Sequence, residues 1–173
     1  MQLHEATDLI KSAIMGSKHP SVWADLGCGD GLFSYALSGL LAPGSCIYAI
    51  DKIIKPHHEI TGNNVEIKFQ KADFITDDLK FSKLDGILMA NSLHYVKEKN
   101  TLLNKLQHYI CQTGIFIIVE YDTLHASKWV PYPINFDQLK QLFASVGYND
   151  LAKIGERQSI YGTQKMFSCS AKS

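Results

Sequence analysis

The 173-residue chain lacks most of the features that would fix its class at a glance. It has only five prolines and no run approaching the roughly 20 apolar residues of a membrane-spanning helix. Its four cysteines are scattered, with no Cys-x-x-Cys pair, which excludes a zinc ribbon or a disulfide scaffold. We therefore expect reduced, mostly buried thiols and no metal site. Because repeats and low-complexity segments are absent too, residues 1–173 are expected to form one domain.

An excess of positive or negative charge is also missing. The chain has 17 basic and 17 acidic residues, so its formal net charge at pH 7 is zero. A protein that holds nucleic acid by neutralising phosphates usually has an excess of Lys and Arg, so nucleic acid is not the expected partner. Residues 1–14 carry charges at regular intervals, unlike a secretory signal peptide. These patterns predict a cytoplasmic protein without membrane contact.

Hydrophobic periodicity alternates between strand and helix along the chain. This alternation predicts an α/β fold with a largely parallel sheet and helices on both faces. Pro56 limits any helix between the second and third strands to one or two turns. Helices are expected at residues 3–15, 32–41, 96–110 and 136–146. Strands are expected at residues 22–26, 46–50, 65–69, 84–89 and 114–119, followed by a hairpin of residues 148–154 and 159–170.

A glycine loop at residues 25–31 (DLGCGDG) follows the first expected strand and opens a helix. Glycines allow a sharp turn and let a ligand approach the backbone closely. Leu32 stands where a dinucleotide-binding loop has its third glycine, and no Gly-Lys-Ser/Thr of a P-loop follows. Asp25 and Asp30 would oppose a pyrophosphate but suit a cationic ligand. The loop therefore favours a cofactor with ammonium or sulfonium groups over NAD.

Asp51 ends the second expected strand, 24 residues after Gly27. A carboxylate at this place can accept hydrogen bonds from both hydroxyls of a ribose. Hydrogen bonds to charged groups contribute about 1.5–3 kcal/mol each. The sequence thus predicts a nucleoside beside the glycine loop.

Residues 22–31 resemble the first motif of class I S-adenosylmethionine-dependent methyltransferases, and residues 47–51 resemble the second. Residues 70–74, 84–96 and 114–120 are similar to the third, fourth and fifth motifs, in the correct order. The resemblance implies a Rossmann-like mixed sheet of seven strands in the order 3-2-1-4-5-7-6. Strand 7 would be antiparallel, which agrees with the terminal hairpin.

The same resemblance implies S-adenosylmethionine as the cofactor and S-adenosylhomocysteine as its product. Asp73 would meet the adenine amino group, and Phe74 would pack on the adenine ring. The cofactor-binding residues implied are Asp25, Gly27, Cys28, Gly29, Gly31, Asp51, Lys52, Asp73, Phe74, Asn91 and Ser92.

His94, in the loop after the fourth strand, is the candidate catalytic base for an acceptor that must lose a proton. The alternative is that His94 fixes this loop or lines the pocket. Residues 1–20, as an N-terminal helix, and residues 122–135 are expected to cover the site. Further candidate wall residues are Tyr35, Tyr121, Asp122, Trp129 and Tyr132.

These patterns predict methyl transfer by in-line displacement to an unidentified acceptor, with a small molecule favoured. A cofactor-binding regulatory subunit and a methyltransferase on RNA or protein are the alternatives. The Asn-Pro-Pro-Tyr signature of nucleobase methylation is absent, since Ser92 and Leu93 fill its proline positions. A second subunit, in a homodimer, is one way to complete the pocket. His57 and His58 have no ligand partner at metal spacing and are expected in an exposed turn.

Overall fold

Short apolar strands build one mixed sheet in the computed structural model, which describes residues 1–14, 18–81, 83–158 and 165–172. The sheet has eight strands in the order β3-β4-β2-β1-β5-β6-β8-β7. The strands are β1 (Val22–Leu26), β2 (Cys46–Asp51), β3 (His57–Ile60), β4 (Glu66–Lys71), β5 (Leu84–Ala90), β6 (Ile110–Tyr121), β7 (Asp150–Gln158) and β8 (Lys165–Lys172). The helices are α1 (Leu3–Ile14), α2 (Leu32–Ser38), the 3-10 turn η1 (Leu93–Tyr95), α3 (Lys99–Leu106) and α4 (Phe136–Ser145).

The centre of the sheet is parallel and its two edges are antiparallel. β1 pairs in parallel with β2 and β5, and the parallel run continues to β4 on one side and β6 on the other. β8 runs antiparallel to both β6 and β7. The carboxyl ends of β1, β2, β4 and β5 therefore meet at one edge, where open α/β sheets bind their ligands.

The expected sheet of seven strands was incomplete, because β3 adds an eighth strand at the outer edge, antiparallel to β4. The sequence suggested a short helical turn and an exposed His pair here. Pro56 lacks the N–H that a helix interior needs, and the free edge of β4 offers hydrogen bonds to the four residues that follow. His57 stacks on Phe69 of β4 at 4.3 Å between ring centroids. The other seven strands keep their expected positions relative to one another.

Two expected boundaries were also wrong. The helix expected at 96–110 is α3, which covers only Lys99–Leu106, because β6 already begins at Ile110. β6 is correspondingly longer than the apolar run at 114–119, since strand pairing continues through the polar residues before it. The last expected strand begins at Lys165, and its predicted residues 159–164 lie outside the described part of the chain.

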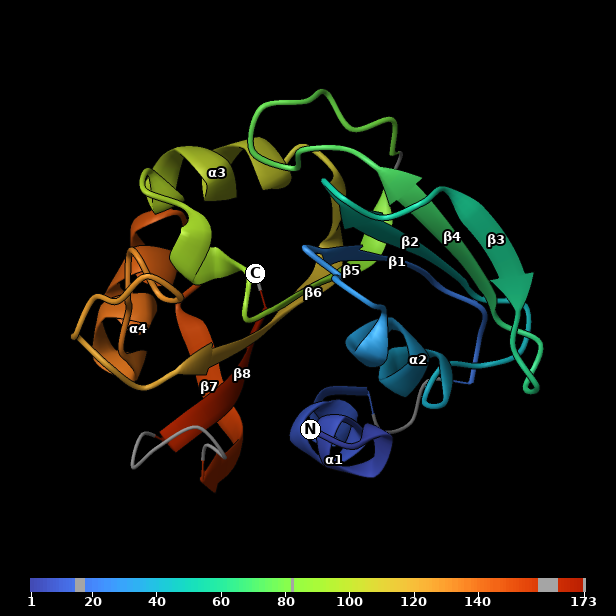
Figure 1. Ribbon diagram of the computed structural model, residues 1–173, viewed down its shortest axis with the longest axis horizontal. Helices are drawn as coiled ribbons and strands as arrows, with labels where there is room; N and C mark the ends of the chain where they lie inside the picture. Colours follow the sequence, from blue (N-terminus) through green and yellow to red (C-terminus); the bar gives the residue numbers. More distant parts are fainter. Residues whose placement is uncertain (15–17, 82, 159–164, 173) are drawn as a thin grey trace.

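The helices cover the two faces of the sheet in pairs (Figure 1). α1 and α2 lie together on one face, and α3 and α4 lie on the other. α1 also packs against β7 and β8, and the Ser168 hydroxyl donates a 2.6 Å hydrogen bond to the Leu9 carbonyl oxygen. Among the described residues, no helix is long and apolar enough to cross a membrane.

Trp23 and Gly86 pack against each other at the middle of the sheet. They are partners in the register of β1 and β5, and the Trp23 side chain is buried. A Cβ atom at Gly86 would lie 2.2 Å from the Trp23 ring. The Trp23 ring thus fills the space that a side chain at Gly86 would need.

Gly86→Ala is expected to lower the free energy of unfolding by about 1–3 kcal/mol, because the added methyl overpacks the core. Urea denaturation measures this change. Gly62→Ala is the matched control, since Gly62 is exposed and a Cβ there meets no atom within 4 Å. Its effect should stay within about 0.5 kcal/mol. Equal losses in the two variants would contradict the packing account.

Candidate functional site

The glycine loop closes over the carboxyl end of β1 in a conformation that side chains rarely adopt. Gly27, Gly29 and Gly31 have φ angles of 79°, 53° and 85°. A Cβ at Gly27 would lie 2.5 Å from the Cβ of Ser92, while a Cβ at Gly29 would meet no atom within 4 Å. The loop is therefore closely packed on the β5 side at Gly27 and open at Gly29.

Hydrogen bonds tie this loop to the end of β2. The N–H groups of Gly27 and Cys28 donate to the Ile50 carbonyl oxygen at 2.8 and 3.0 Å. The Gly29 N–H donates to Asp51 Oδ2 at 3.0 Å, and the N–H of Ile53 donates to Asp51 Oδ1 at 3.0 Å. These bonds hold the Asp51 carboxylate beside the open part of the loop.

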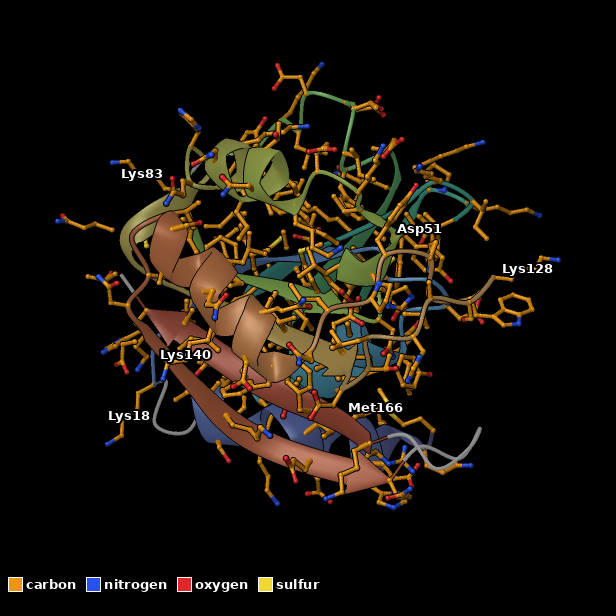
Figure 2. The ribbon with its side chains drawn as sticks, turned by 90° about the vertical axis from the view of Figure 1, so that its left-hand side faces the viewer. Lys18, Asp51, Lys83, Lys128, Lys140 and Met166 are labelled. Atoms are coloured by element: carbon orange, nitrogen blue, oxygen red, sulfur yellow. The ribbon has the colours of Figure 1, made fainter. Side chains whose placement is uncertain are left out.

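Figure 2 shows Asp51 toward the same side of the molecule as Lys128 and Met166. Lys83, which precedes β5, lies toward the opposite side. Met166 belongs to β8, at its pairing with Tyr121 at the end of β6. Asp51 therefore lies at the carboxyl edge of the parallel strands, where the sequence placed the site.

Asp25 is a fully buried carboxyl group at the floor of the loop. Its Oδ2 accepts a 2.6 Å hydrogen bond from the Ser34 hydroxyl, but its Oδ1 has no partner within the described residues. Burial raises the pKa of Asp25 from 3.8 to about 7; the Ser34 bond opposes this rise and the Asp51 charge adds to it. An unpartnered buried acceptor costs about 1–3 kcal/mol, so a bound cation or donor would be stabilising here.

Asn91 supplies a second acceptor of this kind at the end of β5. Its φ is 53°, its N–H donates to the Val119 carbonyl oxygen at 2.8 Å, and its buried Oδ1 has no partner among the described residues. The Ser92 hydroxyl donates to the Leu26 carbonyl oxygen at 2.6 Å, which joins the ends of β5 and β1. The two predicted residues therefore differ in role. Ser92 links the ends of β5 and β1, and Asn91 presents an acceptor oxygen without a partner among the described residues.

Asp73, predicted to meet an adenine, already has protein partners. Its Oδ2 pairs with Lys52 Nζ at 2.8 Å, and its Oδ1 accepts from the Ile75 N–H at 2.9 Å. Burial acts to raise the pKa of Asp73, but Lys52 and the Ile75 bond outweigh it and leave this pKa below its usual value. Phe74 is buried, with its ring 3.3 Å from where a Cβ of Gly27 would lie. The Cys28 thiol is buried as well, and burial raises its pKa.

His94 and Glu120 form a buried pair that extends the site toward β6. His94 Nδ1 lies 2.6 Å from Glu120 Oε2, and the His94 backbone N–H donates to Glu120 Oε1 at 3.1 Å. The two side chains are 3% and 1% exposed. The sequence singled out His94 and missed Glu120 as a site residue. The sequence feature that could have identified Glu120 is that it is a single carboxylate at the end of an apolar run rich in β-branched residues.

The segment from Thr123 to Ile134 is fastened to the turn that carries His94. The Tyr132 N–H donates to the His94 carbonyl oxygen at 3.0 Å. Lys99 Nζ donates to the carbonyl oxygens of Val96 and Tyr132, both at 2.8 Å. Burial lowers the pKa of Lys99, while the Glu120 charge opposes this shift. These bonds hold Tyr132 beside the His94 turn, and the rings of both Tyr132 and Trp129 are exposed.

The structure brings most predicted site residues to one edge, at the ends of β1, β2, β4 and β5. Asp85, near the start of β5, has a structural role: its Oδ2 accepts the Val22 N–H at 2.7 Å. Tyr35 packs beside Phe69, and its part in an acceptor wall stays a prediction. The same holds for α1 as a cover. In the described ranges no three His, Cys, Asp or Glu side chains are grouped to hold a metal.

The comparisons with known proteins agree with this geometry. A family model described as a methyltransferase domain matches residues 20–164. An uncharacterized methyltransferase of Mycobacterium tuberculosis is 26% identical over 113 residues, which are 61% of this chain and 57% of that protein. The match thus spans little more than half the length of this curated relative.

Solved structures share the fold at low sequence identity. The YcgJ protein of Bacillus subtilis is 10% identical, with a TM-score of 0.68 over 98% of both chains. The 1,6-didemethyltoxoflavin-N1-methyltransferase of Burkholderia thailandensis, solved with S-adenosylhomocysteine, is 18% identical, with a TM-score of 0.66 over 99% of this chain and 78% of that one. Magnesium protoporphyrin IX methyltransferase of Synechocystis, solved with S-adenosylmethionine, is 15% identical, with a TM-score of 0.66 over 99% of this chain and 80% of that one.

The family model covers most of the chain, and the solved structures share its fold. The chain therefore belongs to the methyltransferase domain family and has the Rossmann-like fold of S-adenosylmethionine-dependent methyltransferases.

Proposed function

We propose that this protein transfers a methyl group from S-adenosylmethionine to a small-molecule acceptor. The observation that carries the proposal is the pair of unpartnered buried oxygens, Asp25 Oδ1 and Asn91 Oδ1, at the ends of β1 and β5. Acceptor oxygens in this place suit the cationic ammonium of a methionine moiety. Family membership and the cofactors of the related structures support the same reading.

The residues present fit the rest of the cofactor. Asp51 is oriented to accept hydrogen bonds from a ribose, and the open space at Gly29 leaves room for a ligand against the backbone. When bound, S-adenosylmethionine supplies a methyl group on an already activated sulfonium. Lys52 would act by holding Asp73 in place for the adenine amino group. We assign cofactor binding to Asp25, Gly27, Cys28, Gly29, Gly31, Asp51, Lys52, Asp73, Phe74, Asn91 and Ser92.

Two features favour a small acceptor. The formal net charge of zero gives no general attraction for nucleic acid. The 123–134 segment is bonded to the His94 turn through Tyr132 and carries the exposed rings of Trp129 and Tyr132. Such rings favour contact with flat organic molecules. Two of the related enzymes are named for small molecules, 1,6-didemethyltoxoflavin and magnesium protoporphyrin IX. The site would be completed by this segment, by residues 1–20, or by a second copy of the chain.

Asp51→Ala is expected to weaken S-adenosylmethionine binding at least about tenfold, since a charged hydrogen bond to the ribose is lost. Isothermal titration calorimetry measures the dissociation constant. Asp51→Asn, which keeps an oxygen for the Gly29 N–H, separates loss of charge from disturbance of the loop. Asp137→Ala, an exposed acid in the first turn of α4, is the control. Unchanged affinity in Asp51→Ala would remove the ribose assignment.

Asp25 gives the ligand-free protein a distinctive pH dependence. Its folded-state pKa of about 7 lies above the unfolded value of 3.8, so the folded state retains a proton that the unfolded state has lost between these values. The contribution of Asp25 to the free energy of unfolding is therefore fully present below about pH 4 and is lost as the pH rises through about 7. Between about pH 5 and 8, the free energy of unfolding measured with urea should therefore fall less in Asp25→Asn than in the wild-type protein. The difference between the two falls should exceed about 1 kcal/mol. Parallel curves for the two proteins would contradict this role of burial.

A further inference from the structure

Glu120 contacts His94 at two atoms, where an ordinary ion pair has one contact. One carboxylate oxygen lies 2.6 Å from the ring nitrogen Nδ1, and the other accepts the backbone N–H of the same residue at 3.1 Å. Glu120 thus contacts both the ring and the main chain of His94. This double contact fixes the position of the turn and the orientation of the imidazole together.

The chemistry of the contact determines which nitrogen of the ring carries the proton. An ionised carboxylate is only an acceptor, so Nδ1 must be the donor in the 2.6 Å hydrogen bond. In a neutral imidazole the other nitrogen, Nε2, then keeps its lone pair. No hydrogen bond of Nε2 occurs within the described residues. The pair therefore has the arrangement of a base held by a carboxylate.

Other ionisable groups around the pair leave this arrangement intact. Lys99, from α3, is a cation whose charge interacts favourably with the Glu120 charge. Burial raises the pKa of Cys169, on β8, to about 12, so its thiol is neutral. The rings of Tyr95 and Tyr121 lie 4.4 and 6.2 Å from the His94 ring, between centroids. Among the described residues, Glu120 is the one carboxylate that is hydrogen-bonded to the His94 ring.

We propose that Glu120 is a positioning residue that holds His94 with its proton on Nδ1, so that Nε2 accepts a proton from the methyl acceptor. The inference rests on the proposed function and narrows it. The acceptor must then carry a removable proton on its nucleophilic atom, as a hydroxyl or a ring N–H does. A tertiary amine or a thioether, which is methylated without losing a proton, would have no use for this pair.

With a hydroxyl acceptor, one proton would pass to His94 and one methyl group to the acceptor oxygen. The O–H proton passes to Nε2 as an oxygen electron pair forms the bond to the methyl carbon, and the carbon–sulfur bond breaks with its electron pair left on sulfur. The products are a methyl ether, S-adenosylhomocysteine and an imidazolium. The Glu120 carboxylate stabilises this cation at Nδ1, and the proton then leaves to solvent.

The tautomer can be tested without knowing the acceptor. Long-range proton–nitrogen NMR of the full chain at about pH 8, where an ordinary His is neutral, distinguishes a protonated from an unprotonated ring nitrogen. His94→Gln identifies the His94 signals by their disappearance. The expected result is a proton on Nδ1 and none on Nε2, with the proton moved toward Nε2 in Glu120→Gln. A wild-type ring with its proton on Nε2, or on both nitrogens, overturns the proposal.

Turnover then separates positioning from mere structural support. Calorimetry with S-adenosylmethionine comes first, followed by release of S-adenosylhomocysteine with a panel of phenols, hydroxy acids, N–H heteroaromatics, tertiary amines and thioethers. Glu120→Gln and His94→Gln are expected to keep cofactor affinity and lose about 10²-fold or more in turnover. Glu98→Gln, an exposed acid at the start of α3, is the matched control and should change neither.

The outcomes distinguish the two proposals. If the wild-type protein does not bind S-adenosylmethionine, the proposed function fails, while the NMR result still decides whether Glu120 fixes the ring. If it binds the cofactor but methylates only tertiary amines or thioethers, the inference about Glu120 fails alone. A folded Glu120→Gln protein with turnover within about threefold of wild type also overturns it.

Discussion

The site depends on one close contact, between the backbone of Gly27 and the side chain of Ser92. A Cβ atom on Gly27 would lie only 2.5 Å from the Ser92 Cβ, so the loop after β1 can meet the end of β5 only if this residue is glycine. The Ser92 hydroxyl, bound to the Leu26 carbonyl oxygen, holds the same junction from the other side. Because the loop is also tied to the end of β2, three strand ends are fixed relative to one another before any ligand arrives.

Two different polar environments lie on either side of this junction, one with unpartnered oxygens and one with a hydrogen-bonded pair. The folded chain buries the Asp25 carboxyl and leaves oxygens of Asp25 and Asn91 without partners, which costs stability in the ligand-free protein. A cationic ligand would offset that cost, and a ligand of the other charge would increase it. On the far side of Ser92 the chain continues into the turn of His94, where a buried pair with Glu120 is fully hydrogen-bonded on the carboxylate side. One part of the edge therefore presents unpartnered acceptor oxygens, and the next part holds an imidazole through a carboxylate.

The sequence predicted seven of the eight strands and the glycine loop, because both depend on local patterns, whereas the strand order followed from the family resemblance. Apolar runs and glycine spacing are local, and Asp51 was proposed from its place at the end of a strand. Glu120 was missed because its importance comes from pairing with His94, 26 residues away, which only the register of β5 and β6 brings about. β3 was missed because its exposed residues have no apolar pattern and form a strand only through the free edge of β4. The Lys52–Asp73 pair likewise depends on the ends of neighbouring strands lying side by side.

We expect the carboxyl edge around the glycine loop to bind S-adenosylmethionine. The most direct measurement is a titration of the isotopically labelled protein with this cofactor, followed by backbone amide NMR. The account predicts that the largest shifts fall on residues of the 25–31 loop, on Asp51 and on Asn91. Absence of binding, or shifts confined to the opposite end of the sheet around Ser21 and Asp85, where a separate cavity of about 390 Å³ lies, would contradict it.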